Sequence, residues 1–322
     1  MTREGVIELL GSAWTDMLAV LNEGLKSDVD LLNKLNQGII SHSGKMMRPM
    51  MSLLISKALG TPNSDSIRYA AACEMLHNAT LIHDDVADES EQRRGNPTIS
   101  AILGPSAAVL VGDFWLARTV NMVMSADNNP RVVKYFCNTL GALAEGEMLQ
   151  MEKAGSADTQ EEDYYKIIKG KTASLFEASG ASAAESVGAS EELCEAAREY
   201  ALCFGIAFQI KDDILDYAGT SQLGKPLGVD LKEQKITLPL LGALKGAENE
   251  SEIREMVRNI TDHPEYVDII RAFVEERGGI KYATEQLDAY IARAKSALAI
   301  FPESEAKNFL MQIADFNVFR QV

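Results

Sequence analysis

The sequence has few cysteines and histidines, and they are not spaced to hold a metal. Its four cysteines form no CxxC pair, and none of its four histidines stands at metal-ligand spacing from them. A zinc site or a disulfide framework is therefore excluded as the basis of the fold. We expect the cysteines to be reduced core residues of a cytosolic protein.

Positive charge is also scarce. The chain carries 31 Lys and Arg against 47 Asp and Glu, so its formal net charge at pH 7 is -16. Such a field repels nucleic acid and anionic membrane surfaces, and neither is an expected partner. It repels small anions as well. A phosphate site would therefore have to be assembled from local groups of Lys and Arg, or from bound metal.

Long apolar runs are missing. No uninterrupted run approaches the length that spans a bilayer, and the first eight residues lack the apolar core of a signal peptide. The sequence predicts a cytoplasmic protein without a transmembrane segment.

Strand-like alternation is rare, whereas apolar residues recur at helical spacing nearly throughout. Short breaks rich in Gly, Pro and Asn separate the helical segments, and none is long enough for a domain linker. We predict an all-α protein with one domain over residues 1–322, a multi-helix bundle around a central cavity. Helices are expected over 5–24, 28–41, 46–59, 64–89, 98–124, 130–153, 161–179, 190–217, 236–245, 250–260, 264–276, 279–299 and 303–319.

Two acidic elements follow apolar helical runs, Asp84-Asp85-x-x-Asp88 and Asp212-Asp213-x-x-Asp216. Residues four apart share a helix face. Carboxylates about 6 Å apart repel by about 3 kcal/mol at an effective dielectric constant near 20. Magnesium would remove this repulsion, since it takes hard oxygen ligands and is often completed by substrate phosphates. A solvated acidic face would explain one such element, but two matched copies favour metal binding at a cavity mouth.

Basic residues cluster at two places near the first acidic element. Lys45 and Arg48 stand at a helix entry, and Arg93-Arg94 stand in a turn bounded by Gly and Pro. Helix starts and guanidinium groups both attract phosphate. Solvated cations, paired in the turn with neighbouring glutamates, would give the same pattern. His77 lies on the face of Asp84 and is either a phosphate contact or a satisfied core histidine.

Three further segments carry polar groups. Lys171-Thr172 lies in a helical run, and the loop 224–235 follows the second acidic element with glycines and lysines that suit a lid over an anion. An ordinary surface loop would look similar. The acidic segment Glu145-Gly146-Glu147-Met148-Leu149-Gln150 is interpreted as helix packing with a solvated edge.

Taken in order, these segments resemble one family, the trans-prenyl diphosphate synthases, also called polyprenyl synthetases. The resemblance covers nearly the whole chain. The ordered set is Gly44-Lys45-x-x-Arg48-Pro49, His77-x-x-x-Leu81-Ile82-His83-Asp84-Asp85-x-x-Asp88, Arg93-Arg94-Gly95-x-Pro97-Thr98, Gly112-Asp113, Lys171-Thr172, Gln209-x-x-Asp212-Asp213-x-x-Asp216, Gly224-Lys225, Asp230 and Lys235-x-Thr237-Leu238-Pro239. Ser43 and Met46 depart from the family's usual glycine and basic residue, which would weaken binding of isopentenyl diphosphate.

The resemblance implies the isoprenoid synthase fold, magnesium, a homodimer, and elongation of an allylic diphosphate with isopentenyl diphosphate by ionisation, condensation and proton elimination. The catalytic residues that it implies are Asp84, Asp85, Asp88, Lys171, Asp212 and Lys225. Asp84, Asp88 and Asp212 would ligate magnesium directly, and Asp216 would belong to the same metal site. Arg93, Lys171, Thr172, Gln209, Lys225 and Lys235 would hold the allylic diphosphate, and Lys45, Arg48, His77 and Arg94 would hold isopentenyl diphosphate.

Product length depends on the room beneath the first acidic element. Ala79 and Thr80 stand there, and both are small, whereas families of this kind use bulky aromatics near these positions to stop growth early. A medium- or long-chain all-trans product is therefore expected. The alternatives are a short-chain synthase that makes geranylgeranyl or farnesyl diphosphate, and a non-catalytic partner subunit or lipid-binding scaffold.

A bulky side chain at Ala79 tests this placement. We expect Ala79→Tyr to shorten the product, because the ring would fill the space into which the growing chain extends. Chromatography of products made from labelled isopentenyl diphosphate measures the effect. An unchanged chain length at matched turnover would contradict the placement.

Overall fold

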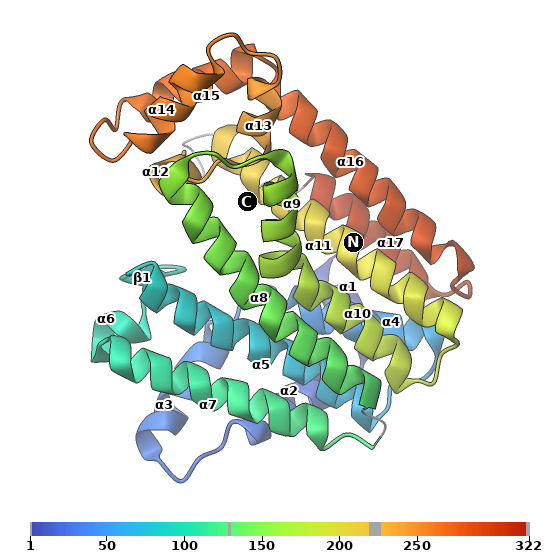
Figure 1. Ribbon diagram of the computed structural model, residues 1–322. Helices are drawn as coiled ribbons and strands as arrows, with labels where there is room; N and C mark the ends of the chain where they lie inside the picture. Colours follow the sequence, from blue (N-terminus) through green and yellow to red (C-terminus); the bar gives the residue numbers. More distant parts are fainter. Residues whose placement is uncertain (1, 128–129, 219–226, 320–322) are drawn as a thin grey trace. The chain divides into compact units, whose positions relative to one another are not determined.

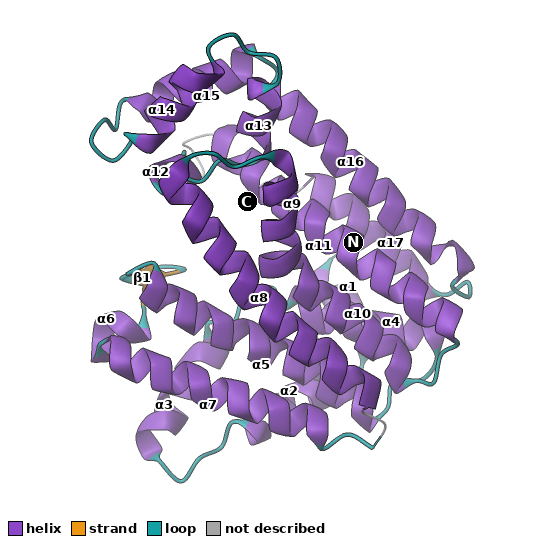
Figure 2. Cartoon of the chain, in the orientation of Figure 1, coloured by secondary structure: helices purple, strands orange, loops and turns teal. Residues whose placement is uncertain are grey.

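The computed structural model describes residues 2–127, 130–218 and 227–319 and is helical nearly throughout (Figure 2). Within these ranges the only strands are β1 (Gln92–Arg93) and β2 (Asn96–Pro97), which form one short antiparallel hairpin. The all-α prediction is thus confirmed. The chain's contacts divide it into two compact units. Unit 1 comprises Met1–Phe136, Ala178–Arg198 and Ile300–Leu310, and unit 2 comprises Cys137–Glu177, Glu199–Ala299 and Met311–Val322.

Unit 1 is built around one long helix, α5 (Ser64–Ala87), which packs against α2, α4 and α7. Figure 1 shows α5 and α7 running side by side. The remaining elements of this part of the chain are α1 (Arg3–Leu10), α2 (Ser12–Gly24), α3 (Asp30–Ser41), α4 (Met47–Leu59), α6 (Ile99–Leu103) and α7 (Pro105–Met124).

Helix α5 is buried around most of its circumference. Tyr69, Ala70 and Ala71 expose none of their surface, although successive residues point about 100° apart around a helix. A helix that is apolar on all sides is stable only inside a core. Its far end carries the first acidic element, so the core of unit 1 determines where those carboxylates stand.

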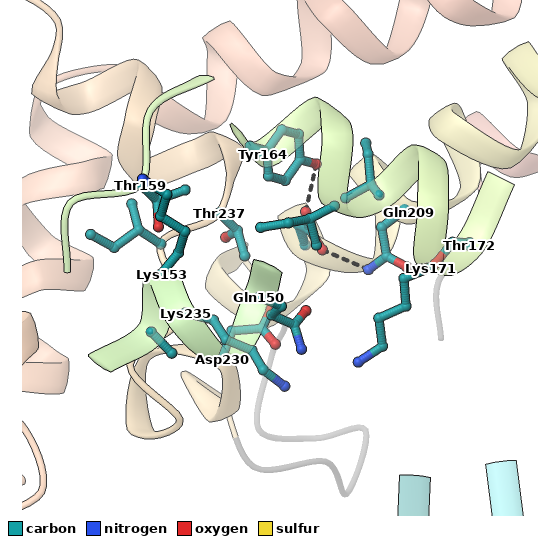
Figure 3. Close-up of a pocket in the computed structure, with 15 residues that line it drawn as sticks. Gln150, Lys153, Thr159, Tyr164, Lys171, Thr172, Gln209, Asp230, Lys235 and Thr237 are labelled. Atoms are coloured by element: carbon teal, nitrogen blue, oxygen red, sulfur yellow. Dashed lines mark hydrogen bonds between the residues drawn. The ribbon is translucent and has the colours of Figure 1, made fainter. Parts of the chain in front are cut away.

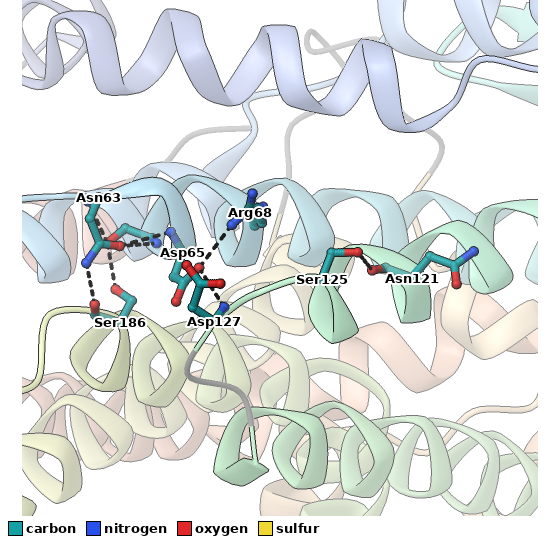
Figure 4. A network of polar contacts seen from close by, with 8 residues as sticks. Asn63, Asp65, Arg68, Asn121, Ser125, Asp127 and Ser186 are labelled. Atoms are coloured by element: carbon teal, nitrogen blue, oxygen red, sulfur yellow. Dashed lines mark hydrogen bonds and ion pairs between the residues drawn. The ribbon is translucent and has the colours of Figure 1, made fainter.

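The start of α5 is secured by a capping box (Figure 4). The Asn63 side-chain oxygen accepts hydrogen bonds from the backbone N–H groups of Asp65 and Ser66 at 2.9 and 3.0 Å. Its amide nitrogen donates to the Ser186 carbonyl at 2.6 Å, which ties the helix start to the end of α10. These bonds satisfy donors that a helix leaves without intrahelical partners.

Helix α7 presents an exposed apolar face together with α6. The residues on this face are Ile102, Leu103, Val109, Leu110, Val120 and Met124, each at least 40% exposed. By length and composition α7 is long and apolar enough to cross a membrane, with a mean hydropathy of 1.3 and a third of its residues buried. The absence of a transmembrane segment accordingly stays a prediction.

Unit 2 contains most of α8 and most of the helices that follow it in the chain. Its elements are α8 (Pro130–Ser156, from Cys137), α9 (Glu161–Ile168), the π-helical turn η1 (Lys169–Ala173), α10 (Ser174–Ser186, to Glu177), α11 (Glu191–Ala218, from Glu199), α12 (Val229–Lys232), α13 (Leu238–Leu244), α14 (Glu250–Arg258), α15 (Tyr266–Glu276), α16 (Gly279–Ala297) and the end of α17 (Glu305–Phe319). Phe176, Phe204 and Phe208 pack together at its centre.

The predicted helix boundaries were wrong at two glycines. The expected helix over 5–24 breaks at Gly11, and the expected helix over 98–124 breaks at Gly104. Both residues have positive φ angles, 55° and 86°, which glycine adopts without the steric cost of a side chain. Pro105 then begins α7, where a missing N–H costs nothing.

We expect Asn63→Ala to lower the free energy of unfolding by about 1–2 kcal/mol, because two helix-start donors lose their acceptor. Chemical denaturation measures this change. Asn249→Ala is the matched control, since Asn249 also precedes a helix but its side chain makes no capping bond there. Equal losses for the two variants would show that the cap contributes nothing specific.

Candidate active site

Unit 2 contains a polar pocket of about 130 Å³ at the second acidic element (Figure 3). It is lined by Gln150, Lys153, Ala154, Thr159, Tyr164, Ile167, Ile168, Lys171, Thr172, Gln209, Asp213, Asp230, Lys235, Ile236 and Thr237. Four residues from the predicted diphosphate set, Lys171, Thr172, Gln209 and Lys235, line this one cavity. Their side chains come from η1, from α11 and from the segment after α12, so tertiary packing brings them together.

A chain of hydrogen bonds connects three of the walls. The Thr172 hydroxyl donates to the Gln209 side-chain oxygen at 2.8 Å, and the Gln209 amide donates to Asp213 at 2.9 Å. The Tyr164 hydroxyl donates to the other Asp213 oxygen at 2.6 Å (Figure 3). Burial nevertheless raises the pKa of the Asp213 carboxyl to about 6. Asp213 therefore acts inside the wall as an acceptor that orients its neighbours.

Two more carboxylates stand beside Asp213. Asp216 accepts hydrogen bonds from the backbone N–H groups of Val229 and Asp230 at 3.0 and 3.2 Å, which fixes the start of α12 on α11. Burial, and then repulsion by Asp213 and Asp216, raises the pKa of Asp230 to about 8. A further negative charge on this side of the pocket is therefore disfavoured, and a cation bound there would stabilise the ionised carboxylate.

The π-helical turn η1 presents Lys171 and Thr172 to the pocket. The Lys171 ammonium forms an ion pair with Glu147 of α8, and the Glu147 side chain is about one-fifth exposed. Glu145 is exposed, whereas Gly146 packs against η1 and Glu147 is only partly exposed, which agrees with the interpretation of this segment as helix packing with a solvated edge. Helical periodicity alone did not identify Lys171 as the partner of Glu147, because it indicates a face but not which neighbour covers it.

The other predicted lysines differ in their surroundings. Lys235 lines the pocket, and its ammonium donates to the Glu233 carboxylate. Lys225, which was predicted to hold the allylic diphosphate, lies outside the described residues, as does Gly224. The predicted lid over 224–235 contains the short helix α12, and its described part packs through Leu231, which is fully buried.

In unit 1 the first acidic element lies at the C-terminal end of helix α5. Asp84 lies in the last turn of the helix and Asp88 is the exposed residue that follows it. Asp85 points inward instead and accepts a hydrogen bond from the Arg93 guanidinium at 2.7 Å. Burial raises the pKa of Asp85, and Arg93 opposes this rise. Asp85 thereby anchors the hairpin that carries the two predicted arginines.

The adjacent arginines separate because they occupy a hairpin. Arg93 turns to Asp85, whereas Arg94 turns to the loop before α4 and donates to the His42 carbonyl at 3.3 Å. Arg94 and Gly95 both have positive φ angles, as in a tight hairpin turn. A Cβ atom at Gly44 would lie 2.7 Å from the Arg94 guanidinium, so the glycine leaves room for this contact.

The predicted isopentenyl diphosphate ligands gather around α4 and α5. Burial lowers the pKa of Arg48 to about 10, and the nearby Glu74 opposes the shift. Burial, with Arg48 and Arg94, holds the pKa of His77 well below its usual value. His77 is therefore neutral at pH 7 and offers a hydrogen bond, while the arginines supply positive charge. Lys45 is exposed, two residues before α4 begins.

The two predicted chain-length residues differ in accessibility. Ala79 exposes none of its surface, whereas Thr80 is partly exposed and its hydroxyl donates to the His77 carbonyl at 2.9 Å. Thr80 is therefore the one of the two with surface that another molecule can contact.

The donor chemistry fits magnesium, but no complete metal site is formed by either acidic element alone. Among the described residues, no group of three or more His, Cys, Asp or Glu side chains is placed to hold a metal ion. Magnesium usually keeps water ligands and takes phosphate oxygens, so one or two carboxylates suffice. Asp84 and Asp88 belong to unit 1, and Asp212 and Asp216 belong to unit 2. Their joint binding of one diphosphate stays a prediction.

Sequence reasoning missed several pocket residues. Tyr164 and Lys153 line the cavity, yet neither stands in a motif, and Gln150 was noted only as the end of the acidic segment 145–150. Lys153 forms ion pairs with Asp158 and Asp163 at 3.3 and 3.2 Å, which hold the end of α8 to the start of α9. The spacing of Tyr164, seven residues before Lys171, is the kind of signal that could have placed it on a related helix face.

Comparison with known proteins identifies relatives along the whole chain. Residues 29–276 match the family model described as polyprenyl synthetase. An octaprenyl diphosphate synthase from Haemophilus influenzae is 38% identical over 299 residues, which are 92% of this chain and 90% of that protein. Relatives named as a short-chain isoprenyl diphosphate synthase and a geranylgeranyl pyrophosphate synthase share less, 33% and 31%.

Solved structures give the same result. A decaprenyl diphosphate synthase from Rhodobacter capsulatus superposes with a TM-score of 0.94 at 32% identity, covering 100% of both chains. A polyprenyl synthase from Caulobacter crescentus, complexed with calcium and isoprenyl diphosphate, superposes with a TM-score of 0.91 at 33% identity, covering 100% of this chain and 98% of that one. The chain therefore belongs to the polyprenyl synthetase family.

Proposed function

We propose that the protein is a magnesium-dependent trans-prenyltransferase that condenses isopentenyl diphosphate with an allylic diphosphate to give a medium- or long-chain all-trans polyprenyl diphosphate. The observation that carries the proposal is the unit 2 pocket, where Lys171, Thr172, Gln209 and Lys235 meet beside the second acidic element. Similarity to octaprenyl and decaprenyl diphosphate synthases supports the chain length. We further propose that both units form one catalytic domain of a cytoplasmic protein.

In this proposal the pocket holds the allylic diphosphate. When the allylic carbon–oxygen bond breaks, negative charge accumulates on the departing diphosphate, and the ammonium groups of Lys171 and Lys235 stabilise it more strongly than the intact substrate. Thr172 and Gln209, already joined at 2.8 Å, orient the phosphate oxygens. Asp84, Asp88, Asp212 and Asp216 would hold magnesium, which would supply further neutralisation of the leaving group's charge.

Isopentenyl diphosphate is assigned to Lys45, Arg48, His77 and Arg94 in unit 1. Its double bond attacks the allylic cation, a carbon–carbon bond forms, and a proton is then lost. No side-chain base is conspicuous among the predicted site residues, so we assign proton acceptance to the departed diphosphate. Water must be excluded because it would quench the cation.

The two alternatives differ from this proposal in what the protein would make. A short-chain synthase would stop at farnesyl or geranylgeranyl diphosphate, and a non-catalytic partner subunit would release no diphosphate. Thr80, partly exposed beneath Asp84, supports the longer product because it is small.

The wild-type protein should release diphosphate from farnesyl and isopentenyl diphosphates only when magnesium is present, and its labelled product should be longer than geranylgeranyl diphosphate. Asp84→Ala and Asp212→Ala should each lower kcat by about 100-fold or more, since each removes charge that holds the metal and leaving group. Circular dichroism should show unchanged helicity.

Asp28→Ala and Asp262→Ala are controls in unit 1 and unit 2, because both aspartates are exposed and belong to neither acidic element. They should retain full activity. Activity that survives in Asp84→Ala and Asp212→Ala, or that is absent in the wild type, would refute the proposed function.

We also propose that a second copy of the chain covers the apolar face of α6 and α7. Contiguous exposed apolar surface of this kind is typical of interfaces. Light scattering should give the mass of a dimer for the wild type, and Leu110→Lys, which changes a residue that is 68% exposed, should shift it towards the monomer. Ile269→Lys on α15 is the control, since Ile269 is exposed by 45% but lies in unit 2. A monomeric wild type would refute the dimer.

A further inference from the structure

Glu147 is a partly buried carboxylate whose two side-chain partners both line the unit 2 pocket. It accepts a hydrogen bond from the Gln150 amide at 3.0 Å and forms an ion pair with the Lys171 ammonium. Gln150 and Lys171 are pocket-lining residues, whereas Glu147 is not. Figure 3 shows Gln150 and Lys171 among the side chains around the cavity. The carboxylate therefore lies behind the wall and holds two side chains that face the cavity.

The backbone beneath this contact is unusually close. A Cβ atom at Gly146 would lie 2.9 Å from the Lys171 backbone nitrogen, and one at Gly170 would lie 2.5 Å from the Ala142 carbonyl oxygen. Helix α8 and the π-helical turn η1 consequently pack backbone to backbone. Glu147, next to Gly146, therefore approaches Lys171 at a fixed distance. π-Helical turns inside helices often mark functional sites, and this one carries two of the predicted diphosphate ligands.

The chemistry of the lysine explains why an anchor is useful. An ammonium group has three N–H donors on a flexible four-carbon stem. The ion pair with Glu147 restricts the stem, while the ammonium still offers donors to oxygens in the pocket. An unanchored lysine would lose this rotamer freedom only on binding, which weakens affinity.

We propose that Glu147 is a positioning residue of the diphosphate pocket, which holds the Lys171 ammonium and the Gln150 amide together so that both meet the same diphosphate. This inference rests on the proposed function, because it takes the pocket as the allylic diphosphate site. A different role would be competition, in which Glu147 occupies Lys171 until a diphosphate displaces it. The two roles predict opposite changes in affinity.

The test is calorimetric binding of inorganic pyrophosphate, with magnesium, to the full-length protein. Glu147→Gln preserves the shape of the side chain but removes its charge. We expect its Kd to rise about tenfold, the value of one charge-assisted hydrogen bond. The KM for the allylic substrate should rise similarly, while the KM for isopentenyl diphosphate stays unchanged. A merely structural defect would not separate the two substrates.

Glu145→Gln is the matched control, since Glu145 is exposed on the same helix and should leave Kd unchanged. Glu147→Asp keeps the charge on a shorter stem and should weaken binding by less than Glu147→Gln. It provides the measurement if Glu147→Gln does not fold.

A double-mutant cycle with Lys171→Met separates this inference from the proposed function. If Glu147 acts chiefly through Lys171, Glu147→Gln should add little to the loss that Lys171→Met already causes. Unchanged or tighter pyrophosphate binding by Glu147→Gln would overturn the positioning role, even where Lys171→Met weakens binding. If Lys171→Met leaves binding unaffected and the wild type makes no product, the proposed function itself fails.

Discussion

A carboxylate inside a protein must be neutralised or must receive hydrogen bonds, and the unit 2 pocket depends on how Asp213 meets this requirement. Its two oxygens accept from Tyr164 and Gln209, and Gln209 in turn accepts from Thr172. Helices α9 and α11 and the turn η1 are thereby joined through one buried group. Removing any donor would leave part of a charge unsatisfied, which is costly at low dielectric.

The same pocket carries unrelieved repulsion. The raised pKa of Asp230 follows from burial beside Asp213 and Asp216, and the nearby Lys235 relieves it only in part. In unit 1, burial and then the charges of Arg48, Arg94 and Arg93 hold the pKa of His77 well below its usual value. Each unit therefore holds carboxylates together with cationic groups, with Lys171 and Lys235 in unit 2 and the three arginines beside the first acidic element in unit 1. A diphosphate-transfer reaction needs both kinds of group.

Close backbone packing fixes the position of Lys171 in this pocket. Glycines at 146 and 170 allow α8 and η1 to approach, and the extra residue of a π-helical turn changes which side chains face inward. Periodicity of 3.6 residues predicts a continuous helix across 161–179, so it gives no sign of this turn. The pairing of Glu147 with Lys171 was not predicted for the same reason, because helical spacing does not identify the neighbouring backbone.

The sequence by itself determined the fold class, the two acidic elements and the order of motifs that indicates the family, because apolar periodicity and residue type are local properties. It also determined where the acidic elements stand on their helices, since residues four apart share a face. The tertiary structure alone decided that Asp85 and Asp213 turn inward, that Arg93 and Arg94 separate, and that Glu147 supports Lys171. Those outcomes depend on contacts between segments far apart in the chain, which no local pattern encodes.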